Sequence, residues 1–216
     1  MQTVNTNSLY LVAWLDPASG PDADKRQVGM SRSAFAVIGQ DNLERIFILE
    51  TWAGRIAPDK LIDRFFATQE KWRPAAFGLD ATGQQKMFAQ ILHKVIQQRA
   101  VKMNFRPSDL KNDKGFAIET TLQPVAASGR LFRPSEGEVR GLKDEWQAFP
   151  DGMYRDTLDA LACAIRLLPS ILPDHMKRMG RDQLRNYLAR TGLSREEIER
   201  RLSLHQEVLK EEGISR

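Results

Sequence analysis

Three short apolar runs of β-forming residues open the chain, and only after them does the spacing of apolar residues become helical. These runs cover residues 9–15, 33–39 and 45–52, and the segment Gln40–Asn42 between the last two has the composition of a turn. Two such runs joined by a short turn are typical of an antiparallel hairpin. From Pro58 onward, apolar residues recur three and four positions apart, which indicates helices.

Strand-like and helix-like segments alternate after Pro58. We expect strands at 75–80 and 101–105, and a brief edge strand at 129–132. Helices are expected over the segments that include Leu61–Phe66, Met87–Ile96, Phe116–Leu122, Val139–Trp146 and Tyr154–Leu168. Crossover helices bring successive strands into parallel pairing, whereas the initial hairpin is antiparallel. The prediction is an α/β fold: a mixed sheet with an antiparallel hairpin start and helices on both faces.

A change of composition follows the last strong helix. Pro169 and Pro173 interrupt the helical pattern, and the residues beyond them are mainly basic and acidic, with a thin apolar stripe. Ser194–Glu197 has the pattern of a capping box, in which the serine and the glutamate each bond the other's backbone amide at a helix start. We therefore predict two parts, a domain at 1–168 and a helical tail at 169–216.

The composition excludes several classes of protein. No stretch approaches the roughly 20 apolar residues that a transmembrane helix needs, and the N-terminus has neither the basic nor the apolar region of a secretory signal. The only cysteine, Cys163, can form no internal disulfide, which suits a reducing cytoplasmic setting. The formal net charge of +4 permits nucleic acid as a partner without requiring it.

Four aspartates have positions that suggest chemistry. Asp16 and Asp80 each end a predicted strand, and ligands of open α/β sheets bind beyond the carboxyl ends of strands. If the first and fourth strands are neighbours, the two carboxylates converge. Asp156 and Asp159 are one turn apart on the last helix, whose other side is apolar, so this helix is expected to be buried on both sides. Buried carboxylates need a counter-charge, and a divalent metal ion supplies one.

The ligand type favours a hard cation. Carboxylate oxygens without nearby Cys or His suit Mg²⁺ or Mn²⁺, and two such ions can activate a water molecule and stabilise the leaving oxygen in phosphodiester hydrolysis. Each acid also has a simpler interpretation. Asp16 can form a turn before Pro17, Asp80 can cap the next helix, and Asp156 and Asp159 can complement a helix dipole.

Several motifs resemble the nuclease domain of phage terminase large subunits. The resemblance covers about residues 9–168, and its specificity lies in the order and spacing of the segments Trp14–Ser19, Ser31–Gly39, Phe77–Gln85, Lys114 with Ile118, Leu122–Pro124, Gly129–Phe132 and Phe149–Ala162. It implies an RNase H-like fold and metal-dependent cleavage of double-stranded DNA during viral genome packaging, in the host cytoplasm. The implied partners are double-stranded DNA and a packaging ATPase domain, portal or small terminase subunit, with no membrane.

Carried over to this sequence, the resemblance implies that Asp16, Asp80 and Asp156 are catalytic metal ligands, with Asp159 close by, and that two Mg²⁺ or Mn²⁺ ions are bound. The family has two adjacent aspartates in its closing motif, and Arg155 stands in place of the first. Asp156 and Asp159 therefore both remain candidates for the direct ligand, and we expect Asp156 to be the one. The chain has no G-x-x-x-x-G-K-[ST] motif, so we expect no ATP hydrolysis.

Basic residues near these motifs are candidates for contacts with DNA phosphates: Arg26, Arg32, Lys111, Lys114 and Arg155. Two other functions remain open. The chain can be another RNase H-like nuclease, of the resolvase or transposase type, which cleavage of branched against linear DNA distinguishes. It can also be a non-catalytic docking module of a packaging motor, which a metal titration distinguishes because a working site binds and is stabilised by the ion.

Overall fold

The structure is a computed structural model, and it describes residues 6–18, 32–41, 44–83, 85–108, 114–133, 139, 141–168, 180–189, 195, 198–199 and 202. The chain separates into two compact units, Met1–Leu168 and Pro169–Arg216. Each unit is described by itself.

The first unit is built on a six-stranded sheet with the strand order β5-β4-β1-β2-β3-β6. Strand β2 is antiparallel to both of its neighbours, β1 and β3, whereas β4 pairs in parallel with β1, β5 with β4, and β6 with β3. This arrangement confirms the predicted mixed sheet with an antiparallel start. The strands are β1 Tyr10–Asp16, β2 Ser33–Gln40, β3 Ile46–Gly54, β4 Ala76–Asp80, β5 Phe105–Ser108 and β6 Leu131–Phe132.

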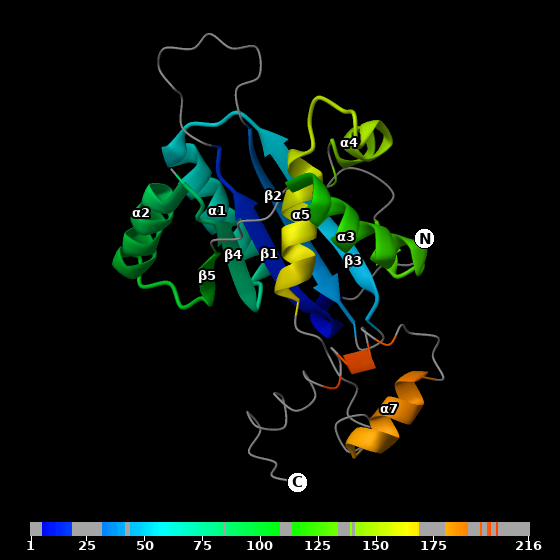
Figure 1. Cartoon of the computed structure of the whole chain (residues 1–216). Coiled ribbons are helices and arrows are strands. Elements are labelled where there is room, and N and C mark those ends of the chain that lie inside the picture. Colours follow the sequence, from blue (N-terminus) through cyan, green and yellow to red (C-terminus); the bar gives the residue numbers. More distant parts are fainter. Residues whose placement is uncertain are drawn as a thin grey trace. The chain divides into compact units, whose positions relative to one another are not determined.

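Helices cover both faces of this sheet, as predicted (Figure 1). One face packs against α3, α4 and α5, and the other packs against α1 and α2. The helices of this unit are α1 Pro58–Trp72, α2 Gln85–Gln98, α3 Lys114–Ala127, α4 Leu142–Ala148 and α5 Asp156–Leu167, preceded by the short 3-10 turn η1 Thr6–Ser8.

Strand β1 shows why the sheet separates two hydrophobic cores. Successive side chains of a strand point to opposite faces, so Val12 and Trp14 pack into the core beneath α5, while Ala13 and Leu15 pack beneath α1 and α2. The strand is buried on both faces, and this explains why its sequence is a continuous apolar run rather than an alternating one.

Two expected boundaries are wrong. The strand expected at 101–105 is instead β5 at Phe105–Ser108, where Phe105 pairs with Phe77 and the strand includes Pro107. Proline is tolerated there because β5 is an edge strand, with one side free of ladder hydrogen bonds. The helix expected from Val139 begins at Leu142, and Val139 forms an isolated bridge with Thr51.

Helix α2 leaves two of its apolar residues at the surface. Met87 and Ile91 are 67% and 46% exposed, whereas Ala89, Leu92 and Ile96 are buried. Phe88 also packs against this core, so the helix presents one apolar face to the sheet and leaves Met87 and Ile91 outside it.

The second unit has a small core of its own. Helix α7 spans Arg181–Ala189, and its Leu184 and Leu188 pack with Ile198 and Leu202. The capping box predicted at Ser194–Glu197 falls on residues that lie largely outside the described part. Over the described ranges of both units, no helix combines the length and the apolar character needed to cross a bilayer.

Candidate active site

Asp16 and Asp80 end two neighbouring parallel strands. Strand β1 pairs with β4 so that Leu15 lies opposite Leu79, and each aspartate follows directly at the carboxyl edge of the sheet. Adjacent strands are about 4.8 Å apart, so the two backbones hold these residues side by side. Both residues are buried, with exposed fractions of 5% and 8%. The condition stated for their convergence, that the first and fourth strands are neighbours, is met.

The same two aspartates face helix α5. Asp16 is in phase with Trp14, and Asp80 is in phase with Ala76, and both of these residues belong to the core beneath α5. Gly78 lies between Ala76 and Asp80 on that face. A Cβ at Gly78 would overlap the ring of Trp14 and come within 3.1 Å of Leu167 on α5. The glycine therefore allows Trp14 and α5 to pack closely next to the carboxyl edge.

Helix α5 brings Asp159 to this region. Asp159 is 6% exposed, and it lies in the first turn of α5. One turn further along, burial raises the pKa of the Cys163 thiol to about 12, and the negative charges of Asp159, Asp16 and Asp80 add to that rise against the opposing effect of Arg166. Coulomb interactions weaken with distance, so three carboxylates that each raise the pKa of the same thiol all lie near it.

A glutamine that the sequence analysis did not single out connects the two strand ends. The side-chain amide of Gln85, in the first turn of α2, donates to Asp16 Oδ1 at 2.9 Å and to the Pro17 carbonyl oxygen at 2.6 Å. Asp80 Oδ1 accepts from the Thr82 backbone N–H at 2.9 Å, and the Thr82 hydroxyl donates to Gln85 Oε1 at 2.9 Å. Gln85 is buried, and a polar residue on the buried face of an amphipathic helix is the signal that could have identified it.

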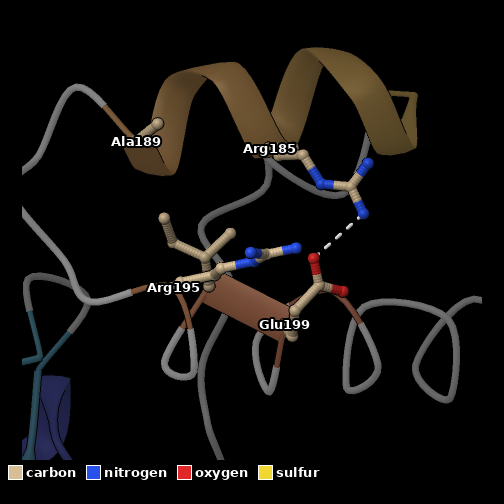
Figure 2. A pocket seen from close by; sticks show the side chains of 5 residues that line it. Arg185, Ala189, Arg195 and Glu199 are labelled. Atoms are coloured by element: carbon tan, nitrogen blue, oxygen red, sulfur yellow. Dashed lines mark hydrogen bonds and ion pairs between the residues drawn. The ribbon is translucent and has the colours of Figure 1, made fainter.

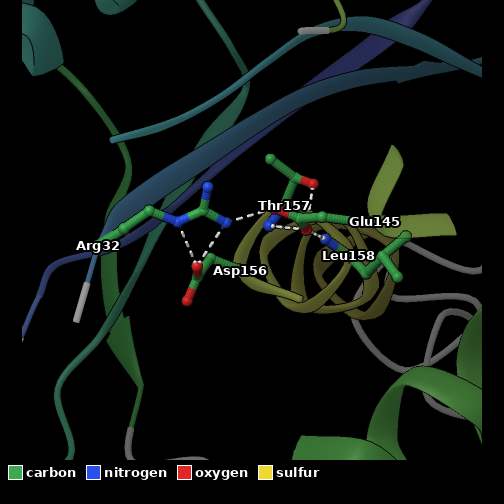
Figure 3. A network of polar contacts seen from close by, with 5 residues as sticks. All are labelled: Arg32, Glu145, Asp156, Thr157 and Leu158. Carbon is green, nitrogen blue, oxygen red and sulfur yellow. Dashed lines mark hydrogen bonds and ion pairs between the residues drawn. The ribbon is translucent and has the colours of Figure 1, made fainter. Parts of the chain in front are cut away.

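Asp156 lies in a different environment from the other three aspartates. Its side chain is 27% exposed, and its Oδ2 accepts from Arg32 Nε at 2.7 Å. Arg32 Nη2 also donates to Glu145 Oε1 at 2.6 Å, so one guanidinium joins two carboxylates, as Figure 3 shows. Burial acts to lower the pKa of Arg32, but the hydrogen bonds and charges of Asp156 and Glu145 outweigh it and raise this pKa.

The predicted DNA contacts have separate outcomes. Arg32 is engaged with Asp156 and Glu145, and its guanidinium lies 3.8 Å from the ring centre of Tyr154. Arg155 is exposed at the residue that precedes α5. Arg26, Lys111 and the side chain of Lys114 lie outside the described part.

The donor chemistry of Asp16, Asp80 and Asp159 fits a hard divalent cation, because all three supply buried carboxylate oxygens. Within the part of the chain that the structure describes, no three His, Cys, Asp or Glu side chains form a group that could hold a metal ion. The carboxyl edge therefore supplies the type of ligand that a hard cation prefers.

The second unit contains a hollow of about 550 Å³ lined by Arg185, Ala189, Arg195, Ile198 and Glu199 (Figure 2). Arg185 Nη2 donates to Glu199 Oε1 at 3.0 Å across it. With one carboxylate and two guanidinium groups among its lining side chains, this hollow does not have the ligands of a metal centre.

Comparison with known proteins identifies the fold. No protein-family model matches the chain, and no curated protein matches it. The large terminase nuclease of the thermophilic phage G20c, solved with bound zinc, has a TM-score of 0.51 and 17% identity over 73% of this chain and 81% of that one. The first unit thus has the RNase H-like fold of a terminase nuclease, and the resemblance predicted from the motifs is confirmed at the level of the fold.

Two further structures are similar at lower scores. The nuclease domain of the large terminase subunit of bacterial virus Sf6, with manganese and beta-thujaplicinol, has a TM-score of 0.44 and 9% identity over 72% of this chain and 87% of that one. Thermus thermophilus RuvC with a Holliday junction substrate has a TM-score of 0.41 and 14% identity over 72% of this chain and 90% of that one.

Proposed function

We propose that the first unit is a divalent-metal-dependent endonuclease that cleaves double-stranded DNA, as in viral genome packaging. One observation carries this proposal: Asp16 and Asp80 are buried side by side at the ends of parallel strands, on the face that α5 covers. The terminase-like fold supports the same conclusion.

Asp16, Asp80 and Asp159 would hold Mg²⁺ or Mn²⁺. Two such ions, when bound, supply an activated water and stabilisation of the leaving oxygen. Without an ion, like charges favour separation of the three carboxylates, and a divalent cation removes that repulsion. Gln85 restricts the rotation of the Asp16 carboxylate by donating a hydrogen bond to its Oδ1. Asp16 ends β1, which lies between β4 and β2 in the sheet, so this hydrogen bond orients a proposed metal ligand at the centre of the site.

Of the two aspartates in the first turn of α5, we propose a different direct metal ligand from the one that the sequence favoured. The sequence analysis favoured Asp156 as the direct ligand. Burial and charge partners support Asp159 instead. Asp159 is buried, and its charge raises the pKa of the Cys163 thiol together with the charges of Asp16 and Asp80. Asp156, in contrast, is paired with Arg32. We therefore assign Asp159 to the metal-binding set and Asp156 to the ion pair with Arg32.

A role in packaging would be shared with an ATPase. No nucleotide-binding loop of the Walker type occurs in the sequence, so an ATPase domain or subunit would drive DNA movement while this unit cuts. Arg155 is exposed at the start of α5 and is our leading phosphate contact. Such contacts hold DNA without reading its sequence, so cleavage should show little sequence preference.

The decisive experiment measures cleavage of linear and supercoiled double-stranded DNA with Mn²⁺, Mg²⁺ or EDTA. The parent chain should cut with either ion and be inactive in EDTA. Asp16→Asn should be inactive, while Asp63→Asn, which makes the same change on the exposed surface of α1, should cut like the parent. Cleavage in EDTA would contradict the metal mechanism. Preference for branched DNA would favour a resolvase, and metal binding without cleavage would contradict the nuclease assignment.

A further inference from the structure

Helix α5 lacks an N-cap of its own. The residue at its N-cap position is Arg155, whose side chain makes no capping hydrogen bond. The first N–H groups of a helix have no acceptor within the helix and need one from outside. Helix α5 carries the aspartate that we assign to the metal-binding set, so the group that fixes this helix end also bears on the site.

Glu145 of α4 supplies the missing acceptor. Its Oε2 accepts from the backbone N–H of Thr157 at 2.8 Å and from that of Leu158 at 3.3 Å, and it also accepts the hydroxyl of Thr157. An N-cap side chain normally binds these same second and third amides. Glu145 is 5% exposed, and its negative charge lies at the positive end of the helix dipole.

The other oxygen of Glu145 connects this cap to strand β2. Arg32, which directly precedes β2, donates to Glu145 Oε1 at 2.6 Å and to Asp156 Oδ2 at 2.7 Å. Figure 3 shows the guanidinium between the two carboxylates and Glu145 next to the first turn of α5. We call Glu145 and Arg32 together the α5 clamp.

We propose that the α5 clamp positions Asp159 for metal binding. Glu145 holds the first turn of the helix, and Arg32 holds Asp156 in an ion pair. The backbone N–H of Asp159 donates to the Arg155 carbonyl oxygen at 2.9 Å. The position of Asp159 therefore depends on the helical turn that Glu145 caps. Both members of the clamp are positioning residues that act through Asp159. This inference rests on the proposed function.

Glu145→Gln tests the clamp with almost no change of shape. An amide group has one acceptor oxygen, so the glutamine side chain cannot serve both Arg32 and the helix amides as the carboxylate does. We expect Mn²⁺ affinity to fall at least tenfold, in line with the loss seen when partners of metal ligands are removed. Hydrogen exchange at the Thr157 and Leu158 amides should become faster in EDTA. Glu44→Gln, which alters the ion pair of Glu44 with Arg130 (2.8 Å), is the matched control and should match the parent.

Affinity is measured at a temperature well below the melting transition, where a chain that is merely destabilised binds like the parent. Arg32→Lys is the second variant and decides the case if Glu145→Gln does not fold. One ammonium group cannot reproduce the fork of a guanidinium, so its Mn²⁺ affinity should fall several-fold. Parent-like affinity in a folded Glu145→Gln, or in Arg32→Lys, overturns the clamp. A parent chain that binds no Mn²⁺ instead contradicts the proposed function, whatever the exchange rates of α5.

Discussion

Gln85 donates one hydrogen bond to the carboxylate of Asp16 and another to the carbonyl oxygen of Pro17, from a helix that begins 69 residues after Asp16. Gln85→Ala removes both bonds and the acceptor of the Thr82 hydroxyl. We expect the cleavage rate to fall about 10- to 100-fold, as for other groups that orient metal ligands. Gln97→Ala, on the exposed side of α2, should cut like the parent. Equal rates for both variants would remove Gln85 from the site.

The four aspartates should divide into two groups. Asp16→Asn, Asp80→Asn and Asp159→Asn should each abolish cleavage and the rise in melting temperature that Mn²⁺ produces. In EDTA these variants should melt no lower than the parent, because removing one of several like charges relieves repulsion. Asp156→Asn should keep the Mn²⁺ response and part of the activity. Thermal melting and cleavage assays check this, and an inactive Asp156→Asn beside a near-normal Asp159→Asn would reverse the assignment.

Cys163 should make the free energy of unfolding depend on pH in the alkaline range. The pKa of this thiol is raised from 9.0 to about 12 in the folded chain. The protonated thiol therefore stabilises the folded state below pH 9, and this contribution to the free energy of unfolding is lost as pH rises toward 12. In that window the parent should lose on the order of 1 kcal/mol per pH unit more than Cys163→Ala. Urea unfolding at several pH values measures the difference, and parallel curves for the two chains would contradict the prediction.

Gly78→Ala should destabilise the first unit. The added methyl group would overlap the Trp14 ring and press on Leu167, and overpacking of this kind costs about 1–3 kcal/mol. Urea unfolding should show the loss, and cleavage should fall as well, since Trp14 and Gly78 each lie two residues before the strand ends at Asp16 and Asp80. Gly180→Ala is the control, because the nearest atom to its new methyl group is 4.0 Å away.

The tail should be dispensable for cleavage. Within its described part, four buried residues form a separate small core: Leu184, Leu188, Ile198 and Leu202. A chain that ends at Leu168 should therefore fold, with circular dichroism and a cooperative melt like those of the longer chain, and should cut DNA at a similar rate. An insoluble or non-cooperative product would show that the tail completes the first unit.

Local patterns were sufficient for most of the fold. The hairpin of β2 and β3, the strand that ends at Asp80 and helix α5 follow from residue spacing, because alternation and helical periods are properties of neighbouring residues. The bounds of β5 did not follow, because its pairing with β4, and not its own composition, determines where it begins.

The candidate site divides in the same way. Asp16 and Asp80 were identifiable because each residue ends an apolar strand, and strand ends are visible in the sequence. Our proposal of Asp159 in place of Asp156 rests on the tertiary structure. The guanidinium that binds Asp156 belongs to Arg32, 124 residues away, and the carboxylate that caps α5 belongs to a separate helix. Burial and charge pairing arise from contacts between distant segments, so they cannot be predicted from the spacing of two aspartates on one helix.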